Sequence, residues 1–231
     1  MCPSGTPAKQ AEKPEIAAEE QKIRRRASKE FRREQLINAT IDSIATKGYS
    51  ATTLADVADG AGLSRGIVNF HFDSKEKLFI ETLTSMSDEY GAHWRKALDA
   101  SGSTSASRLR ALVVADLDSA ICNPRMISAW FAFWAEAVTR PAYQDLCWSH
   151  DDDYLKAINS LCHALKEEGG YAFSPDRTAT AVYALQEGLW LRLMFGGKDF
   201  SPADALATAL EAIGNLFPKH FEHDGTISHK D

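Results

Sequence analysis

Apolar residues recur along this chain at three- and four-residue steps, and no segment shows a sustained two-residue alternation. The first three-to-four-residue pattern covers residues 28–47 and stops at Gly48, a typical C-cap glycine. Two shorter patterns follow at 54–60 and 64–72, and a long one covers 73–100. The spacing therefore predicts an all-α fold that begins with three closely spaced helices.

Proline and glycine divide the rest of the chain. Ser-Pro pairs at 174–175 and 201–202 are strong helix starts, because proline is tolerated in the first turn. The helices predicted between these breakers are 105–121, 125–140, 141–168, 174–195 and 201–217.

The composition is that of an ordinary globular protein. The chain has 231 residues, 44% hydrophobic and 25% charged, enough for one or two domains. It contains no apolar run near the roughly 20 residues of a membrane span, and residues 1–21 lack the order of a signal peptide. Its four cysteines show no C-x-x-C spacing. We therefore expect a soluble, cytoplasmic protein.

The net charge is −6, and the charged residues are unevenly distributed along the chain. Residues 22–77 carry eleven Lys/Arg against seven Asp/Glu, so the remainder is strongly acidic. A basic end on an acidic body is consistent with nucleic-acid contact through that end alone. An exposed helix that is merely basic is the alternative.

Residues 53–72, TLADVADGAGLSRGIVNFHF, predict two short helices joined by a tight Ala-Gly-Leu turn. Small residues at the turn permit the close crossing of a helix-turn-helix. Arg65 and Asn69 then occupy the exposed start of the second helix, where side chains can read guanine and adenine. Thr53, Ser64 and Lys75 stand at helix starts, where phosphates are bound. An ordinary helical hairpin is the alternative.

The segments Thr-Leu-Ala-Asp-Val-Ala, Ala-Gly-Leu-Ser, Asn-Phe-His-Phe and Ser-Lys-Glu-Lys-Leu resemble the N-terminal domain of the tetracycline-repressor (TetR) family over residues 30–83. The resemblance implies a three-helix DNA-binding domain, a divergent ligand-binding domain and a two-fold homodimer. It carries over these DNA contacts: Thr53, Ser64, Arg65, Gly66, Asn69, His71 and Lys75.

Four regions are expected. Residues 1–27, with three prolines and a basic end, are predicted to be a disordered arm. Residues 28–73 form the helix-turn-helix DNA-binding domain, 74–218 the ligand-binding and dimerisation domain, and 219–231 a flexible tail.

Aromatic residues gather in the C-terminal part, interleaved with acids. Ring faces with nearby carboxylates favour a bound organic cation. The rings could instead be core packing or a dimer interface. The candidate ligand-binding residues are Trp130, Phe133, Trp134, Trp148, Tyr183, Glu187 and Trp190.

The segments WFAFWAE (130–136) and EGLWLR (187–192) are similar to the choline-responsive, BetI-type branch of the TetR family, over most of 127–197. Glu187 stands where that branch usually has Asp, and Asp151–Asp153 has no counterpart there. The likeness implies a repressor released by choline or a related quaternary ammonium, controlling glycine betaine synthesis. The resemblance also implies that the last two helices form the dimer interface, through Val182, Leu185, Leu189, Leu193, Leu206, Leu210, Ile213 and Phe217. If these side chains are instead core within the chain, the dimer surface lies elsewhere.

Other functions remain open at this point. A TetR-type repressor with another ligand, or with no inducer, has the same helical pattern. His150, Asp151–Asp153 and His163 could form the metal site of a helical enzyme, although a solvated acidic face explains them better. Because no Gly-rich phosphate loop or Ser/His/Asp nucleophile motif is present, we expect neither catalysis nor a cofactor.

Overall fold

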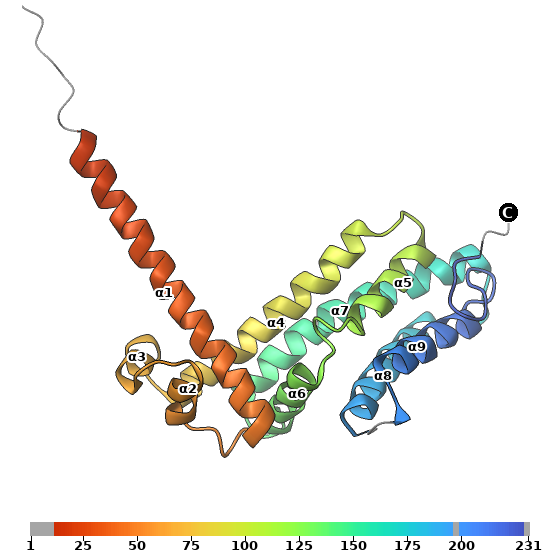
Figure 1. Ribbon diagram of the computed structural model, residues 1–231. Coiled ribbons are helices and arrows are strands. Elements are labelled where there is room, and N and C mark those ends of the chain that lie inside the picture. Colours follow the sequence, from red (N-terminus) through yellow and green to blue (C-terminus); the bar gives the residue numbers. More distant parts are fainter. Residues whose placement is uncertain (1–11, 196–198, 229–231) are drawn as a thin grey trace, which may run out of the picture.

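The computed structural model describes residues 12–195 and 199–228, with side chains for the same ranges except 12–27 and 148–151. This part is all-helical apart from one isolated β-bridge, between Phe221 and Ile227 (Figure 1). Its helices are α1 (Glu12–Lys47), α2 (Leu54–Gly60), α3 (Arg65–His71), α4 (Lys75–Ala100), α5 (Ser105–Asp116), α6 (Pro124–Ala137), α7 (Pro141–Gly169), α8 (Pro175–Phe195) and α9 (Pro202–Leu216).

The predicted all-α fold is confirmed, and several helix starts have the expected caps. The hydroxyl oxygens of Ser74 and Ser201 accept backbone hydrogen bonds at the starts of α4 and α9. Helix α5 is shorter than predicted, ending at Asp116 instead of residue 121. Asp118 accepts a hydrogen bond from the backbone of Ala120, and this local turn competes with the helix.

The structure differs from the predicted disordered arm at residues 12–27, which continue α1 (Figure 1). The stretch is rich in Ala, Glu, Gln, Lys and Arg, whose intrinsic helix propensity requires no apolar periodicity. Residues 1–11 of the predicted arm lie outside the described residues.

The structure also differs from the predicted flexible tail, because residues 219–228 pack against the helical body. Phe221 is only 2% exposed, and the backbone carbonyl of Gly225 accepts a hydrogen bond from Arg110 Nε at 3.2 Å. The tail backbone lies so close to α9 that a Cβ on Gly214 would stand 2.4 Å from the carbonyl oxygen of Glu222. Burial of a large ring thus fixes this segment to the helical body.

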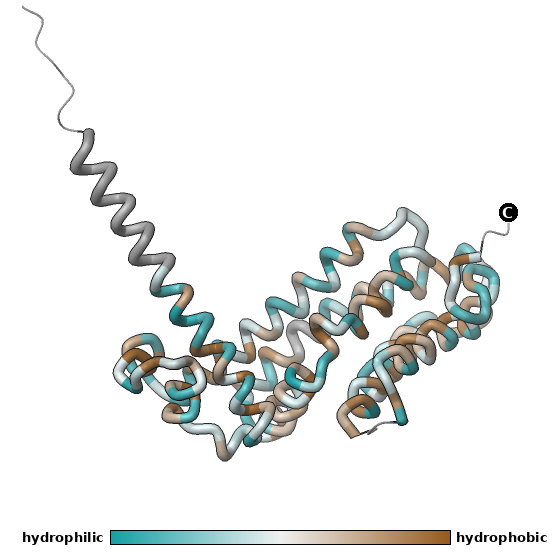
Figure 2. Tube along the Cα trace, in the orientation of Figure 1, coloured by the Kyte–Doolittle hydropathy of each residue, from teal (hydrophilic) through white to brown (hydrophobic). Residues whose placement is uncertain are grey.

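Helix α7 packs against α4, α5, α6 and α8, and so lies at the centre of the C-terminal domain. Tyr143 and Tyr154, both fully buried, fill its inner face. Apolar and polar residues are interspersed along each of these helices (Figure 2). Among the described residues no helix is long and apolar enough to span a membrane.

The predicted dimer face on α8 and α9 needs correction. Val182, Leu189, Ile213 and Phe217 are buried within the chain, because α8 and α9 pack against each other and against the helices beneath them. The large apolar side chains that α8 exposes are Leu191, Met194 and Phe195.

Replacing Phe221 with alanine tests the docking of the tail. We expect Phe221→Ala to lower the free energy of unfolding by about 3 kcal/mol, since a buried ring is lost and a cavity remains. Chemical denaturation measures this, with Val138→Ala as control, because Val138 is 80% exposed. Equal stability of the two variants would show that the tail contributes nothing.

Candidate DNA-binding surface and ligand pocket

Helices α2 and α3 cross through small and branched apolar residues. Val57 and Ala58 of α2 and Val68 of α3 are buried. Between the helices Gly62 has φ 64°, a conformation that favours glycine, and the amide of Leu63 donates to the carbonyl of Ala58 at 2.9 Å. This turn fixes the orientation of α3 and leaves its outer face uncovered.

The predicted base-reading residues lie together on that outer face. Arg65, Gly66 and Asn69 are exposed on α3, and Ser64 precedes them as an exposed N-cap whose side chain accepts no capping hydrogen bond. A Cβ on Gly66 would meet only Ser64 Oγ, at 3.7 Å, so the packing of the chain does not require glycine here. Its small size instead leaves room for close approach from outside.

Thr53 and Lys75 flank this face but already have partners. The Thr53 hydroxyl donates to Asp56 Oδ2 at 2.7 Å and caps α2. Lys47 hydrogen-bonds the same carboxylate, and with Thr53 it lowers the pKa of Asp56. The Lys75 ammonium lies over the rings of Tyr49 and Phe79 at the start of α4.

His71 is only partly exposed, unlike most of the predicted DNA contacts. Its Nδ1 is buried and has no hydrogen-bond partner among the described residues. Burial, and then the positive charges of Lys29 and Arg33, lower the pKa of His71, so the ring is neutral at pH 7. Next to it, Phe70 is 72% exposed.

A second candidate site lies inside the C-terminal domain, where α4, α5, α6 and α8 meet. The pocket holds about 370 Å³ outside the protein atoms, part of it open to solvent. It is lined by Tyr90, Asp116, Trp130, Trp134, Tyr183, Gln186, Glu187 and Trp190.

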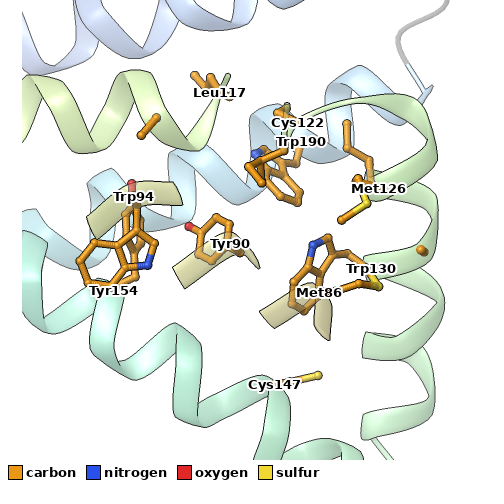
Figure 3. Packing of buried hydrophobic residues seen from close by; sticks show 14 of the residues in the cluster. Met86, Tyr90, Trp94, Leu117, Cys122, Met126, Trp130, Cys147, Tyr154 and Trp190 are labelled. Atoms are coloured by element: carbon orange, nitrogen blue, oxygen red, sulfur yellow. The ribbon is translucent and has the colours of Figure 1, made fainter. Parts of the chain in front are cut away.

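The rings of the pocket meet mostly edge to face. Tyr90 lies 6.4 Å from Trp130 and 6.2 Å from Trp190, centroid to centroid, with interplanar angles of 74° and 88° (Figure 3). Trp130 and Trp134, one turn apart on α6, are 6.2 Å apart. Edge-to-face packing is a favourable arrangement for aromatic rings.

Asp116, which is 5% exposed, provides a carboxyl group beneath these rings. Tyr90 Oη donates to Asp116 Oδ1 at 2.8 Å, and Trp190 Nε1 donates to the Asp116 backbone carbonyl at 3.2 Å. Burial raises the pKa of Asp116 to about 7, although the Tyr90 hydrogen bond acts in the opposite direction. The carboxyl is therefore poised to change charge near neutral pH.

Glu187 adds a second acid on the α8 wall. Burial raises the pKa of this group as well. Behind it, Gln186 Nε2 donates to the Tyr154 hydroxyl at 3.0 Å, and that hydroxyl donates to the Leu112 carbonyl at 3.0 Å. This buried chain holds α8 against α5 and α7.

Five of the seven predicted ligand residues line this pocket: Trp130, Trp134, Tyr183, Glu187 and Trp190. Phe133 does not, because its place on α6 turns it toward Tyr49, Phe79 and Tyr143, against which its ring packs. The side chain of Trp148 lies outside the described residues.

Sequence reasoning missed Tyr90, Asp116 and Gln186. A signal for Asp116 was present, because Leu109, Leu112 and Val113 place residue 116 on the apolar face of the same helix. An acid at such a position is buried, and buried acids are commonly functional.

The acidic stretch of α7 forms ion pairs. Asp153 binds Arg95 at 3.0 Å, Asp152 pairs with Lys156, and His163 contacts Asp176 at 3.0 Å. Within the described ranges no three His, Cys, Asp or Glu side chains are grouped so as to hold a metal ion. His150 and Asp151 are outside that side-chain description.

An exposed helix in a helix-turn-helix and an aromatic pocket in a separate helical domain are together typical of a DNA-binding transcriptional regulator. Residues 36–82 match the family of bacterial regulatory proteins of tetR type, and residues 105–218 match the C-terminal domain of BetI-type transcriptional repressors. The chain is 34% identical over 189 residues to the transcriptional regulator BetI of Paraburkholderia phymatum, covering 81% of this chain and 94% of that protein. BetI of Burkholderia thailandensis is 33% identical over 191 residues, with the same coverage.

Solved structures show the same architecture. A transcriptional regulator from Pseudomonas aeruginosa PAO1 has a TM-score of 0.71 at 26% identity, over 82% of this chain and 91% of that one. A regulator from Saccharomonospora viridis, in complex with choline, has a TM-score of 0.69 at 22% identity, over 81% and 95%. The chain belongs to the TetR family of transcriptional regulators and carries a BetI-type C-terminal domain. It is a DNA-binding repressor of this type, from a non-enzymatic family.

The buried Asp116 predicts a pH-dependent effect on stability. Its pKa is raised in the folded chain, so the folded form keeps a proton that the unfolded form releases, and this stabilisation is lost as pH rises from about 4 to about 7. The Asp116→Asn variant has no titrating carboxyl at this position, so its stability does not fall in this way as pH rises. We expect its stability relative to wild type to increase by about 2 kcal/mol from pH 5 to pH 8.

Denaturation of both proteins at the two pH values measures the effect. Asp118→Asn, a change at an exposed acid nearby, is the matched control. A stability difference between Asp116→Asn and wild type that does not vary with pH would contradict the assignment.

Proposed function

We propose that this protein represses genes of glycine betaine synthesis and that choline, or a closely related quaternary ammonium, releases it from its operator. The observation that carries the proposal is the pocket itself, in which five aromatic rings surround two carboxyl groups. Rings and carboxylates together attract a cation that is poorly hydrated and has no N–H to donate, which is the chemistry of a quaternary ammonium.

Charge balance supports a cationic ligand. An ionised Asp116 is costly in this apolar place unless a positive charge compensates it. A bound cation therefore favours the ionised form and lowers the pKa of the carboxyl from about 7, so that binding at slightly acid pH releases a proton. The affinity for choline should accordingly fall as pH drops below 7.

Helix α4 links the pocket to the DNA-binding surface. Lys75 stands at its start beside α3, and Tyr90, about 22 Å further along the axis, contacts Asp116 in the pocket. A ligand that displaces the Tyr90 ring thus tilts a helix whose other end positions α3.

Helix α6 provides a second link. It carries Trp130 and Trp134, and near its start Arg125 binds Asp42 and the Asn38 carbonyl of α1, the latter at 3.0 Å. A shift of α6 is therefore transmitted to the helix that supports α2 and α3.

The proposal includes a two-fold dimer, since paired recognition helices must reach major grooves about 34–36 Å apart. The exposed side of α8 and α9 is the proposed interface. Leu191, Met194 and Phe195 present apolar surface there, and the exposed Gly188 permits a close approach of helices. Ligand binding that alters the separation of the recognition helices then opposes DNA binding.

Calorimetric titration with choline tests the ligand. We expect saturable binding, and binding at least about thirtyfold weaker for 3,3-dimethyl-1-butanol, in which carbon replaces the charged nitrogen, because about 2 kcal/mol of cation–π attraction is lost. Trp190→Ala should weaken choline binding, and Val138→Ala on the outer surface should not.

Equal affinity for choline and the neutral alcohol would refute a cation site. No binding of either compound would remove the choline proposal and leave the helix-turn-helix assignment intact.

A further inference from the structure

Helix α1 extends well beyond the core that it helps to form. Among its described side chains the first buried one is Leu36, and those of residues 28–35 are all at least partly exposed. Residues 12–35, here called the α1 extension, cover about 36 Å of helix at 1.5 Å per residue. The extension points away from the C-terminal domain (Figure 1). Core packing does not account for residues 28–35.

The α1 extension starts beside the C-terminal end of α3. The Arg33 guanidinium lies 5.2 Å from the ring centroid of Phe72, the C-cap residue of α3, and it pairs with Glu81 of α4. After burial, the positive charges of Lys29 and Arg33 are the next causes that lower the pKa of His71 at the end of α3. The face of α1 that carries Lys29 and Arg33 therefore borders the DNA-binding surface.

This face of the helix is basic over about three turns. Lys22, Arg26, Lys29 and Arg33 follow one another at steps of four, three and four residues, which places them on one helix face, and Arg25 lies at its border. Residues 21–29 contain no Asp or Glu.

The charges of this face lack compensation within the protein. Lys29 is exposed and has no carboxylate partner among the described side chains. Like charges three and four residues apart on a helix repel each other, and a polyanion beside the helix removes this repulsion. Duplex DNA is such a polyanion, with one negative charge per roughly 1.7 Å of its axis.

We propose that the basic face of the α1 extension, formed by Lys22, Arg25, Arg26 and Lys29, binds phosphates of the operator outside the major groove that α3 enters. Arg33, held by Glu81 and Phe72, orients this face toward the DNA. Such a contact adds affinity and carries no sequence information of its own. The inference does not depend on the identity of the inducer.

The salt dependence of DNA binding by the full chain tests the inference. The variant replaces Lys22, Arg25, Arg26 and Lys29 with glutamine, which keeps a high helix propensity. Its binding to a labelled duplex, selected from random fragments by the wild type, is followed by fluorescence anisotropy between 50 and 200 mM salt. We expect the slope of log affinity against log salt to fall by about 3 to 4 per bound chain. At 150 mM salt the affinity should fall at least about tenfold.

Two further measurements separate phosphate binding from base reading and from folding. Affinity for a duplex of scrambled sequence should fall by a similar factor, because a phosphate contact weakens binding to all sequences alike. The single change Lys29→Gln, at an exposed position, should lower the salt slope by about 1 per bound chain.

A variant of equal net charge is the matched control. It replaces Arg95, Lys96, Lys156 and Arg177, which are exposed on the C-terminal domain, with glutamine. The control should keep the salt slope of the wild type. A slope unchanged in the α1 variant, or lowered equally in the control, would overturn the inference. A loss of affinity confined to the selected duplex would also overturn it, because the extension would then read bases.

Discussion

The hydrogen bond between Tyr90 and Asp116, 2.8 Å long and fully enclosed, is the constraint on which the sensing domain depends. It joins α4 to α5 at a point where Trp130, Trp190 and Tyr154 surround the tyrosine ring. A carboxyl group in such a place destabilises the folded chain when it ionises. The ionised carboxyl is therefore unfavourable while the pocket is empty, and under the proposed function a bound cation stabilises it, as expected at a binding site.

The same interaction explains how a pocket inside the domain can affect a distant DNA surface. Tyr90 belongs to the helix that starts at Lys75, and Trp130 belongs to the helix that Arg125 joins to α1. In the proposed mechanism, a small displacement at the rings changes the orientation of α3 through these two helices. Coupling free energies of about 1–3 kcal/mol, which are usual for such linkage, suffice to shift a repressor off its operator.

Local chemistry made much of the fold predictable. The capping residues Thr53 and Ser201, and Gly48 with φ 83°, mark helix ends that the structure confirms. The exposed positions of Arg65 and Asn69 followed from the same pattern. The sequence pattern could not show how the helices pack against one another. Phe133 is aromatic like its neighbours, but its direction on α6 places it in the core. Asp116 becomes part of a site only because α4, α5 and α8 meet there.

The most direct test of the account is the effect of choline on DNA binding. An operator selected from random DNA fragments, labelled for fluorescence anisotropy, is titrated with the protein at fixed salt and increasing choline. The account predicts a choline-dependent loss of affinity for wild type, a much weaker response for Asp116→Asn, and little DNA binding at all for an Arg65→Ala, Asn69→Ala chain. DNA affinity that stays constant while choline saturates its pocket would contradict the central claim, because ligand and operator would then be uncoupled.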